Sequence, residues 1–258
     1  MFFANSSASN VYRWVGDGLH IFAIVILLVK FYVRKNSTGV SGKTQLLFAL
    51  TYTARYLDVW TNWVSYYNTV MKIFYIIISY FIVYLTLRVF KETYNKDHDS
   101  FRIEVLLIPV TLLAFTINYE STFMEISWAW SIYLESVCLV PQLYMIWKAK
   151  TSDFYVILYV LFMGLYRGLY IANWAYRYKM DGYVDLISIT GGIIETFIAL
   201  VGFLCVISQS VTNALSSSTN GKKVTGRPES VYVVPLISSE CKSKVDAVGK
   251  PNAHHLSV

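Results

Sequence analysis

The stretch WVGDGLHIFAIVILLVKFYV, residues 14–33, decides the class of fold. It is almost entirely apolar, and an α-helix needs about 20 such residues to cross the hydrocarbon core of a bilayer. The first ten residues, MFFANSSASN, contain neither a basic region nor an apolar core, so we expect no cleavable signal peptide. Residues 14–33 are therefore predicted to be a transmembrane helix that also directs the chain to the membrane.

Six further apolar segments follow, which predicts an all-α membrane protein with seven transmembrane helices in contact with lipid. Hydrophobic residues make up 55% of the 258 residues and charged residues only 15%, against about 25% charged residues in average globular chains. The fourth segment is the shortest of the seven. The predicted helices span residues 14–33, 45–63, 73–87, 105–117, 123–147, 156–174 and 184–207.

The composition changes after Ile207, which predicts two regions. Residues 1–207 form the seven-helix domain. Residues 208–258 are polar, with runs such as SSSTNGKKVTGRPES, and lack an apolar stripe at helical spacing, so we expect a disordered tail. The three cysteines, Cys138, Cys205 and Cys241, indicate no disulfide framework.

The basic residues predict the orientation of the helices. Of the 22 lysines and arginines, 16 lie at the loops after the first, third and fifth segments or in the tail. Because cytosolic loops carry an excess of basic residues, these loops and the tail are expected in the cytosol and the N-terminus in the lumen. This distribution also accounts for the net charge of +6 without a nucleic-acid partner.

The other basic residues lie within segments or at their lumenal ends. An ionisable side chain in a spanning helix costs several kcal/mol unless it is paired or faces water, so each is a candidate for function. Lys72 and Lys179 are expected to extend toward the membrane surface. The other four of this group are Arg13, Arg55, Arg167 and Arg177.

Helical spacing brings polar residues of four segments onto shared faces. Arg13, Asp17 and His20 stand at i, i+4 and i+7 of the first segment. A rise of 1.5 Å per residue places all four faces within about 15 Å of the lumenal helix ends. We therefore expect a polar cavity open to the lumen. The other faces hold Arg55, Asp58 and Asn62; Glu125, Trp128 and Glu135; and Tyr166, Tyr170, Asn173 and Arg177, with Arg167 and Trp174 beside them.

The content of this cavity suggests a ligand with several carboxylates and one cation. Arginine matches a carboxylate through two parallel hydrogen bonds, and aromatic side chains can cover apolar parts of a ligand. A short acidic peptide with a free C-terminus fits. Alternative interpretations stay open: an Arg–acid pair can tie two helices together, His20 can be a hydrogen-bonded core residue, and Glu195 can pair with an arginine or face water. No metal cluster, nucleophile–base pair or phosphate loop is visible, so neither a cofactor nor enzymatic activity is expected.

Four motifs resemble the KDEL receptor family, over residues 10–207. They are GVSGKTQLLFALTYTARYLD (39–58), YNTVM (67–71), SIYLESVCLVPQ (131–142) and GLYRGLY (164–170) with NW (173–174). The resemblance implies a receptor of Golgi and ER membranes. Such a receptor binds the C-terminal Lys-Asp-Glu-Leu or His-Asp-Glu-Leu signal of escaped ER proteins at acidic pH, for retrograde return. The Pro141-Gln142 pair is similar to PQ-loop and sugar-transporter proteins, which implies two three-helix repeats around a linker helix.

The resemblance also implies roles for individual residues. His20, Glu135 and Tyr166 match positions linked to pH sensing, and Lys222 and Lys223 match a sorting motif read by vesicle coat proteins. Two positions of the last helix depart from the family: an Asp is replaced within ALVG (199–202), and a Gln is replaced by Glu195. The tail also continues well past Lys223. The matching ligand-binding positions are Arg13, Arg55, Tyr56, Asp58, Asn62, Glu125, Trp128, Tyr166, Arg167, Tyr170, Trp174 and Arg177.

Two other function classes fit a seven-helix chain. A small-solute transporter of the PQ-loop type needs a midplane site with access from both sides, whereas the charged residues here gather toward one side. A receptor of the G-protein-coupled kind fits the helix count, but the short loops and the lack of lumenal cysteines argue against it.

Overall fold

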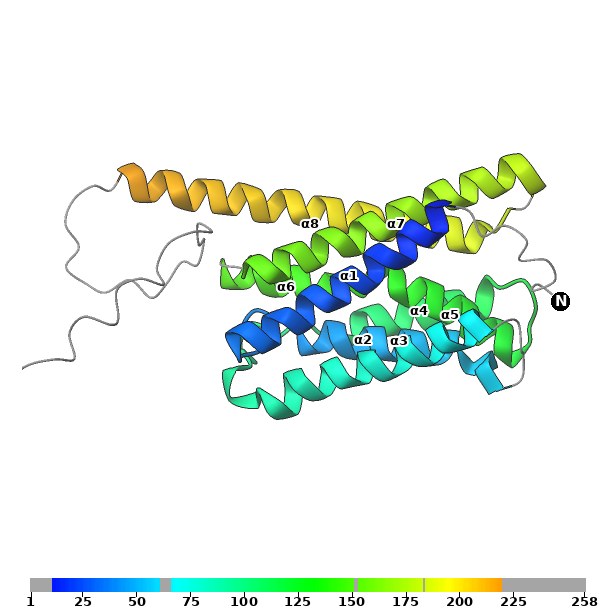
Figure 1. The fold of residues 1–258 in the computed structure, drawn as a ribbon, viewed down its shortest axis with the longest axis horizontal. Coiled ribbons are helices and arrows are strands. Elements are labelled where there is room, and N and C mark those ends of the chain that lie inside the picture. The colour runs from blue at the N-terminus through cyan, green and yellow to red at the C-terminus, as the bar shows by residue number, and fades with distance from the viewer. Residues whose placement is uncertain (1–10, 61–65, 151–152, 183, 220–258) are drawn as a thin grey trace, which may run out of the picture.

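The computed structural model describes residues 11–60, 66–150, 153–182 and 184–219, and within these ranges the chain is helical, with no β-strand. Three short helical turns, η1 (Leu57–Trp60), η2 (Leu85–Val89) and η3 (Lys91–Thr93), join or extend the longer helices. Figure 1 shows the helices running roughly side by side. The main helices are α1 (Val11–Arg34), α2 (Gly42–Arg55), α3 (Tyr66–Tyr84), α4 (Glu104–Thr116), α5 (Phe123–Val137), α6 (Val140–Ala149), α7 (Phe154–Asp181) and α8 (Leu186–Thr219).

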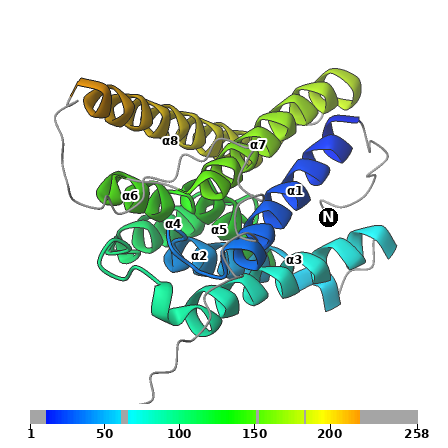
Figure 2. The ribbon, with the colours of Figure 1, turned by 60° about the vertical axis from the view of Figure 1, so that its left-hand side comes forward.

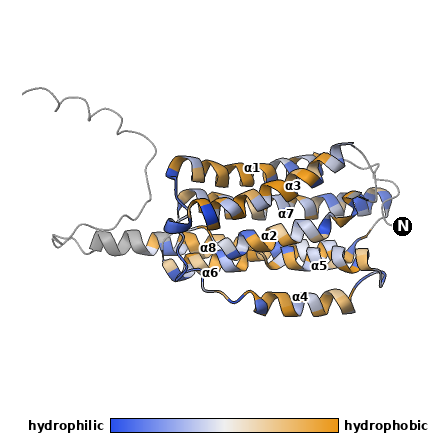
Figure 3. Ribbon diagram, turned by 90° about the horizontal axis from the view of Figure 1, so that it is seen from below, coloured by the Kyte–Doolittle hydropathy of each residue, from blue (hydrophilic) through white to orange (hydrophobic). Residues whose placement is uncertain are grey.

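Some of the described helices have the length and apolarity of membrane spans. Four segments qualify on both counts: α1, α3 with η2, α7, and Leu186–Gln209 of α8; α4 is a shorter apolar helix. Many large apolar side chains lie on the outside of the bundle, such as Leu112 and Phe197. Figure 3 shows hydrophobic residues along the middle of the helices and hydrophilic ones gathered toward their ends. The prediction of an all-α membrane protein is confirmed, while the repeat arrangement stays a prediction.

The predicted helix 123–147 is wrong in one respect, because the chain breaks it into α5 and α6. The break falls at Cys138 and Leu139, just before Pro141, which occupies the first turn of α6. Proline has no backbone N–H to donate, and its ring clashes with the carbonyl four residues earlier. A helix can begin at such a proline but cannot pass through it undisturbed.

Other boundaries also differ from the prediction: α3 begins at Tyr66, not at residue 73, and α7 runs to Asp181, not to residue 174. Helix α2 ends at Arg55, since Tyr56 leaves the helical conformation with φ −108° and ψ 23°, and Asp58 falls in η1. Helix α8 continues beyond the predicted end at Ile207 as far as Thr219. No proline or glycine interrupts residues 208–219, so nothing forces the backbone out of the helix there. Residues 220–258 lie outside the described ranges, and their disorder stays a prediction.

The helices surround a core in which α2, α5 and α7 take part. Helix α7 packs on α1 and α8, α2 packs on α3 and α5, and α5 also contacts α4 and α8. Figure 2 shows α1 beside α7, with α3 across the bundle from α8. A Cβ atom on Gly164 of α7 would come within 2.7 Å of the Cβ of Ala199 on α8. The absence of a side chain at Gly164 thus lets α7 and α8 approach closely.

Buried hydrogen bonds close the end of the bundle that holds the loops after α1 and α3. The Ser41 backbone N–H donates to Gln142 Oε1 at 2.9 Å, and Ser41 Oγ donates to Asp99 Oδ1 at 2.8 Å. The Tyr94 hydroxyl donates to Asp99 Oδ2 at 2.5 Å. Burial and this hydrogen bond raise the pKa of Tyr94, which keeps it a neutral donor. The contacts hold α2, α6 and the loop before α4 together.

Candidate functional site

A polar cavity of about 230 Å³ lies inside the bundle, between α1, α2, α3, α5 and α7, with one residue from α8. Side chains from segments far apart in the sequence line it. The lining residues are Arg13, Asp17, His20, Tyr52, Arg55, Tyr56, Tyr67, Asn68, Met71, Lys72, Tyr75, Ile132, Glu135, Tyr166, Arg167, Tyr170, Trp174 and Ser188.

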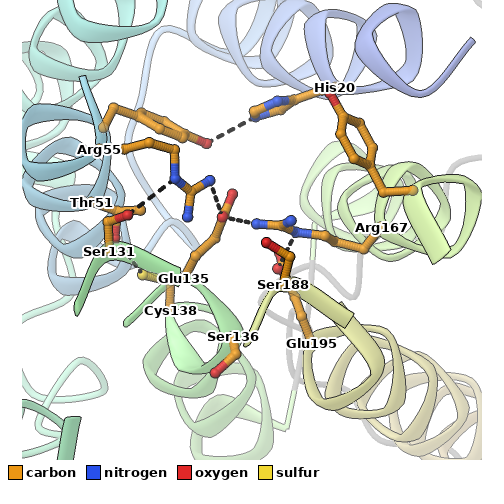
Figure 4. A network of polar contacts seen from close by, with 12 residues as sticks. His20, Thr51, Arg55, Ser131, Glu135, Ser136, Cys138, Arg167, Ser188 and Glu195 are labelled. Atoms are coloured by element: carbon orange, nitrogen blue, oxygen red, sulfur yellow. Dashed lines mark hydrogen bonds and ion pairs between the residues drawn. The ribbon is translucent and has the colours of Figure 1, made fainter. Parts of the chain in front are cut away.

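Two arginines and two glutamates meet at the inner part of this cavity (Figure 4). Glu135 of α5 forms ion pairs with Arg55 of α2 and with Arg167 of α7. Arg167 Nε also lies 2.5 Å from Glu195 Oε2 of α8. Both glutamates and Arg167 are almost fully buried. Removing one member would leave a buried charge unpaired, which costs far more than an exposed pair is worth.

Arg55 has an unused donor at this point. Its Nε donates to Ser131 Oγ at 3.1 Å, and its Nη1 contacts Glu135. Its Nη2 is buried and has no hydrogen-bond partner among the described residues. A buried polar group without a partner is rare and costs about 1–3 kcal/mol. Arg55 Nη2 can therefore donate a hydrogen bond to a carboxylate that enters the cavity.

His20 of α1 lies between aromatic rings beside the charged centre. Its ring stacks on Tyr166 with centroids 4.3 Å apart and on Tyr75 with centroids 4.6 Å apart. Its Nε2 lies 2.8 Å from the Tyr52 hydroxyl. Tyr166 in turn donates to Glu135 Oε1 at 2.7 Å. His20, Tyr166 and Glu135, which the resemblance linked to pH sensing, are thus next to one another.

The cavity is more exposed toward the end at which α1 begins. Arg13 and Asp17 are half-buried and Tyr67 is exposed, whereas His20 further along α1 is buried. The Tyr170 hydroxyl donates to Asp17, and the Tyr67 hydroxyl lies 3.5 Å from the same carboxylate. A rise of 1.5 Å per residue places His20 about 10 Å deeper than Arg13. The cavity lining therefore becomes more buried inward from this end.

The structure brings together most of the predicted site residues. Each of the four predicted faces contributes an acid or a base to the lining. Asn62, Lys222 and Lys223 lie outside the described residues. The predicted residues that line the cavity are Arg13, His20, Arg55, Tyr56, Glu135, Tyr166, Arg167, Tyr170 and Trp174.

Four predicted residues do not line the cavity. Glu125 stands in the first turn of α5, where its N–H donates to Thr122 Oγ1, and Trp128 packs against the Tyr119 ring. Arg177 is half-buried near the end of α7. Asp58, in η1, forms a buried ion pair with Lys72 at 2.7 Å. The expectation that Lys72 extends to the membrane surface is wrong, because Asp58 neutralises it inside the bundle.

Several lining residues were not singled out as site residues from the sequence. Tyr52 stands three residues before Arg55, on the same helical face, and this spacing was the available signal. Tyr75 and Ile132 are apolar or aromatic residues within apolar runs, so no local pattern distinguishes them from core. Glu195, for which the sequence allowed either an arginine partner or exposure to water, lies outside this lining and pairs with Arg167. Among the described residues, no group of three His, Cys, Asp or Glu side chains is placed to hold a metal ion.

Comparison with known proteins agrees with this arrangement. The family model described as "ER lumen protein retaining receptor" matches residues 36–177, more than half of the chain. "ER lumen protein-retaining receptor 2" of Gallus gallus is 48% identical over 187 residues, covering 72% of this chain and 88% of the relative. The Homo sapiens protein of the same name is 47% identical over 189 residues, 73% and 89% of the two chains. "ER lumen protein-retaining receptor 3" of Mus musculus is 46% identical over 187 residues, 72% and 87%. By this extent of identity, the chain belongs to the ER lumen protein retaining receptor family, which is the KDEL receptor family that its motifs resemble.

Proposed function

We propose that this protein is a retrieval receptor and not an enzyme. It binds the C-terminal Lys-Asp-Glu-Leu or His-Asp-Glu-Leu signal of ER lumenal proteins that have reached the Golgi, and it carries them back to the ER. The observation that carries the proposal is Arg55 Nη2, which has no partner among the described residues and lies in a buried, one-sided polar cavity. The names of the relatives, which are ER lumen protein-retaining receptors, support the same function.

The chemistry of the cavity suits the end of an acidic peptide. A C-terminal carboxylate and acidic side chains require arginine donors, and Arg13 and Arg55 are at the mouth and the centre of the cavity. Tyr56, Tyr170 and Trp174 supply aromatic surface for the leucine side chain. The basic residue of the signal needs an acid, for which we propose Asp58 and Glu125. Asp58 has to exchange Lys72 for the ligand's cation.

The volume of the cavity limits how much of the peptide enters it. Ligand pockets usually measure about 300–1,000 Å³, and the cavity measures about 230 Å³. The C-terminal residues of a tetrapeptide fit within the cavity, while its N-terminal residues lie at the mouth. There we propose that Arg177, Glu125, Trp128 and Asn62 complete the site.

The orientation that we propose places this mouth in the lumen of Golgi and ER membranes. The N-terminus and the start of α1 then face the lumen, and the basic loops and the tail face the cytosol. Vesicle coat proteins meet the tail on the cytosolic side, where Lys222 and Lys223 form the proposed sorting signal. The apolar stretch ALVG (199–202) and the long tail point to a trafficking signal that differs from the family's usual one.

A solute transporter is not favoured. Alternating access requires a site that opens to both sides of the membrane. Here the Ser41, Asp99 and Gln142 contacts hold the other end of the bundle together through buried hydrogen bonds. The arginines in the cavity also favour a ligand with carboxylates over a neutral sugar.

A comparison of peptides with free and blocked C-termini tests the proposal. The purified protein should bind acetyl-Lys-Asp-Glu-Leu as a free acid at about pH 5.5–6, where imidazole is mostly protonated. The C-terminal amide of the same peptide should bind at least about 30-fold more weakly, since a charge-assisted hydrogen bond inside a buried site is lost. Equal binding of acid and amide would show that the cavity does not read a C-terminus.

A further inference from the structure

Helix α8 contributes one carboxylate to the charged centre, from behind the cavity. Glu195 is fully buried, with its Oε2 2.5 Å from Arg167 Nε and its Oε1 3.5 Å from the Tyr166 hydroxyl. Arg167 is among the cavity-lining residues, whereas Glu195 is not. Figure 4 shows Arg167 between Glu135 and Glu195. Glu195 therefore holds Arg167 from the side away from an entering ligand.

The two glutamates divide the guanidinium of Arg167 between them. Its Nε contacts Glu195, and its Nη2 contacts Glu135. A bidentate arginine–carboxylate pair needs two parallel N–H groups directed at one carboxylate. Because these two nitrogens each face a different glutamate, a ligand carboxylate cannot occupy that edge of Arg167 without displacing one of them. Arg55, by contrast, has an Nη2 without a hydrogen-bond partner in the described part of the chain.

The charges at the centre cancel because of Glu195. Arg55 and Arg167 carry two positive charges, and Glu135 and Glu195 carry two negative charges. A neutral residue at position 195 would leave the group with one positive charge. An excess positive charge in a poorly solvated site attracts every additional negative charge on a ligand, because charges there are weakly screened. Position 195 thus controls how strongly the cavity favours acidic ligands.

We propose that Glu195 is a positioning residue that sets the charge selectivity of the cavity. It fixes Arg167 against α8 and neutralises it, so that the ligand's carboxylates are received mainly by Arg55 and by Arg13 at the mouth. The affinity of the cavity then depends less steeply on the negative charge of the peptide than it would with a neutral residue at position 195. This inference rests on the proposed function, because it concerns recognition of the same acidic peptides.

The test measures how affinity depends on peptide charge in the wild type and in Glu195→Gln. Three N-acetylated free-acid peptides of similar size serve as probes: Lys-Asp-Glu-Leu, Lys-Asn-Glu-Leu and Lys-Asn-Gln-Leu. One unscreened charge at such short range changes affinity roughly tenfold. Glu195→Gln should therefore bind the most acidic peptide roughly tenfold more tightly than the wild type does. The gain should shrink with each acid removed and be smallest for the third peptide, which keeps only its C-terminal carboxylate.

Three further variants make the outcome decisive. Glu195→Met is a second neutral variant and should show the same charge-dependent gain. Glu195→Asp keeps the charge and should keep the wild-type dependence. Glu104→Gln removes one negative charge from the exposed start of α4 and should leave the affinity for all three peptides unchanged.

Four results would overturn the inference: an equal change for all three peptides, no change, a gain in Glu104→Gln, or loss of folding in both neutral variants while Glu195→Asp folds. The last result would mean that Glu195 only holds α7 and α8 together. Failure of the proposed function looks different, because the wild type would then bind none of the three peptides.

Discussion

The guanidinium of Arg55 links the fold to ligand binding. Two of its nitrogens contact Ser131 and Glu135, while Nη2 has no partner within the described part of the chain. Arg55→Ala should reduce binding of the Lys-Asp-Glu-Leu peptide by about 2–5 kcal/mol, since the ligand carboxylate loses a partner in a desolvated site. Calorimetry or fluorescence anisotropy at acidic pH measures this loss.

The matched control for Arg55 is Arg88, an exposed arginine of η2. Arg88→Ala removes the same side chain far from the cavity and should bind the peptide like the wild type. Glu135 keeps Arg167 as a partner in Arg55→Ala, so the variant should still unfold cooperatively on heating. Normal affinity in a folded Arg55→Ala protein would remove Arg55 from the proposed ligand site.

We expect protonation of His20 to make peptide binding depend on pH. The unperturbed imidazole titrates near pH 6.5, between Golgi-like and ER-like pH. An anionic peptide beside His20 favours the protonated ring, so by linkage protonation favours binding. The coupling is present at acidic pH and is lost as the pH rises through the pKa of the bound state. His20→Ala should weaken binding at about pH 5.5–6 and flatten the pH dependence.

Glu135 is the rival for this role, because it lies one hydrogen bond from Tyr166, on which His20 stacks. If His20→Ala retains the full pH dependence of binding, a carboxylate is the titrating group. His20 is then a core histidine held by Tyr52 and its two stacked rings. A pH titration of peptide affinity for wild type, His20→Ala and Glu135→Gln separates the two cases.

Lys72 shows which residue-level properties the sequence could not supply. Its position near a helix end is typical of a side chain that extends to the membrane surface. In the structure it is buried with Asp58 at 2.7 Å. The two residues belong to different helical elements, and helical spacing reports only neighbours within one helix. A partner across the bundle therefore stays invisible to this kind of pattern.

At the scale of elements, the close contact of α7 with α8 places Arg167 beside Glu195. It depends on Gly164, where an added Cβ would meet the Ala199 Cβ at 2.7 Å. Gly164→Val should lower stability by about 1–3 kcal/mol, as expected for overpacking. Gly168→Ala is the control, since its Cβ would lie 3.9 Å from the nearest atom, Thr196 Cγ2, and it should not lower stability. Thermal unfolding in detergent measures both, and equal stability of Gly164→Val and wild type would contradict this packing.

The helices themselves could mostly be predicted, because apolar runs of spanning length have few alternatives in a membrane. The ends of the helices were harder to predict from the sequence. The break before Pro141 divides the fifth predicted helix, and proline gave a readable signal for it. The end of α2 at Arg55 carried no such signal, since residues 56–60 (YLDVW) contain neither proline nor glycine and all but Asp58 are apolar or aromatic.

At the scale of the whole molecule, the orientation decides which compartment the cavity serves. From the basic loops we predict a lumenal N-terminus and a cytosolic tail. Protease added outside intact Golgi vesicles should remove an epitope attached after Val258 and spare one attached before Met1. Protection of the epitope after Val258 would reverse the orientation and place the cavity mouth in the cytosol.

The site was predictable as a set of residues more than as a geometry. Arg13, Arg55 and Arg167 come from three different helices, and their depth in the membrane predicted that they meet. Which acid pairs with which arginine could not be read from depth, because it depends on how the helices pack. The central position of Glu135 between Arg55 and Arg167 is a property of the folded bundle.

Direct binding of acetyl-Lys-Asp-Glu-Leu to the purified full-length protein, at two pH values, tests the central claim most directly. We predict saturable binding at about pH 5.5–6 that is markedly weaker at about pH 7.2, a window set by the reference pKa of imidazole. Absence of binding at both pH values, or tighter binding at the higher one, would contradict a receptor that captures its ligand in the Golgi and releases it in the ER.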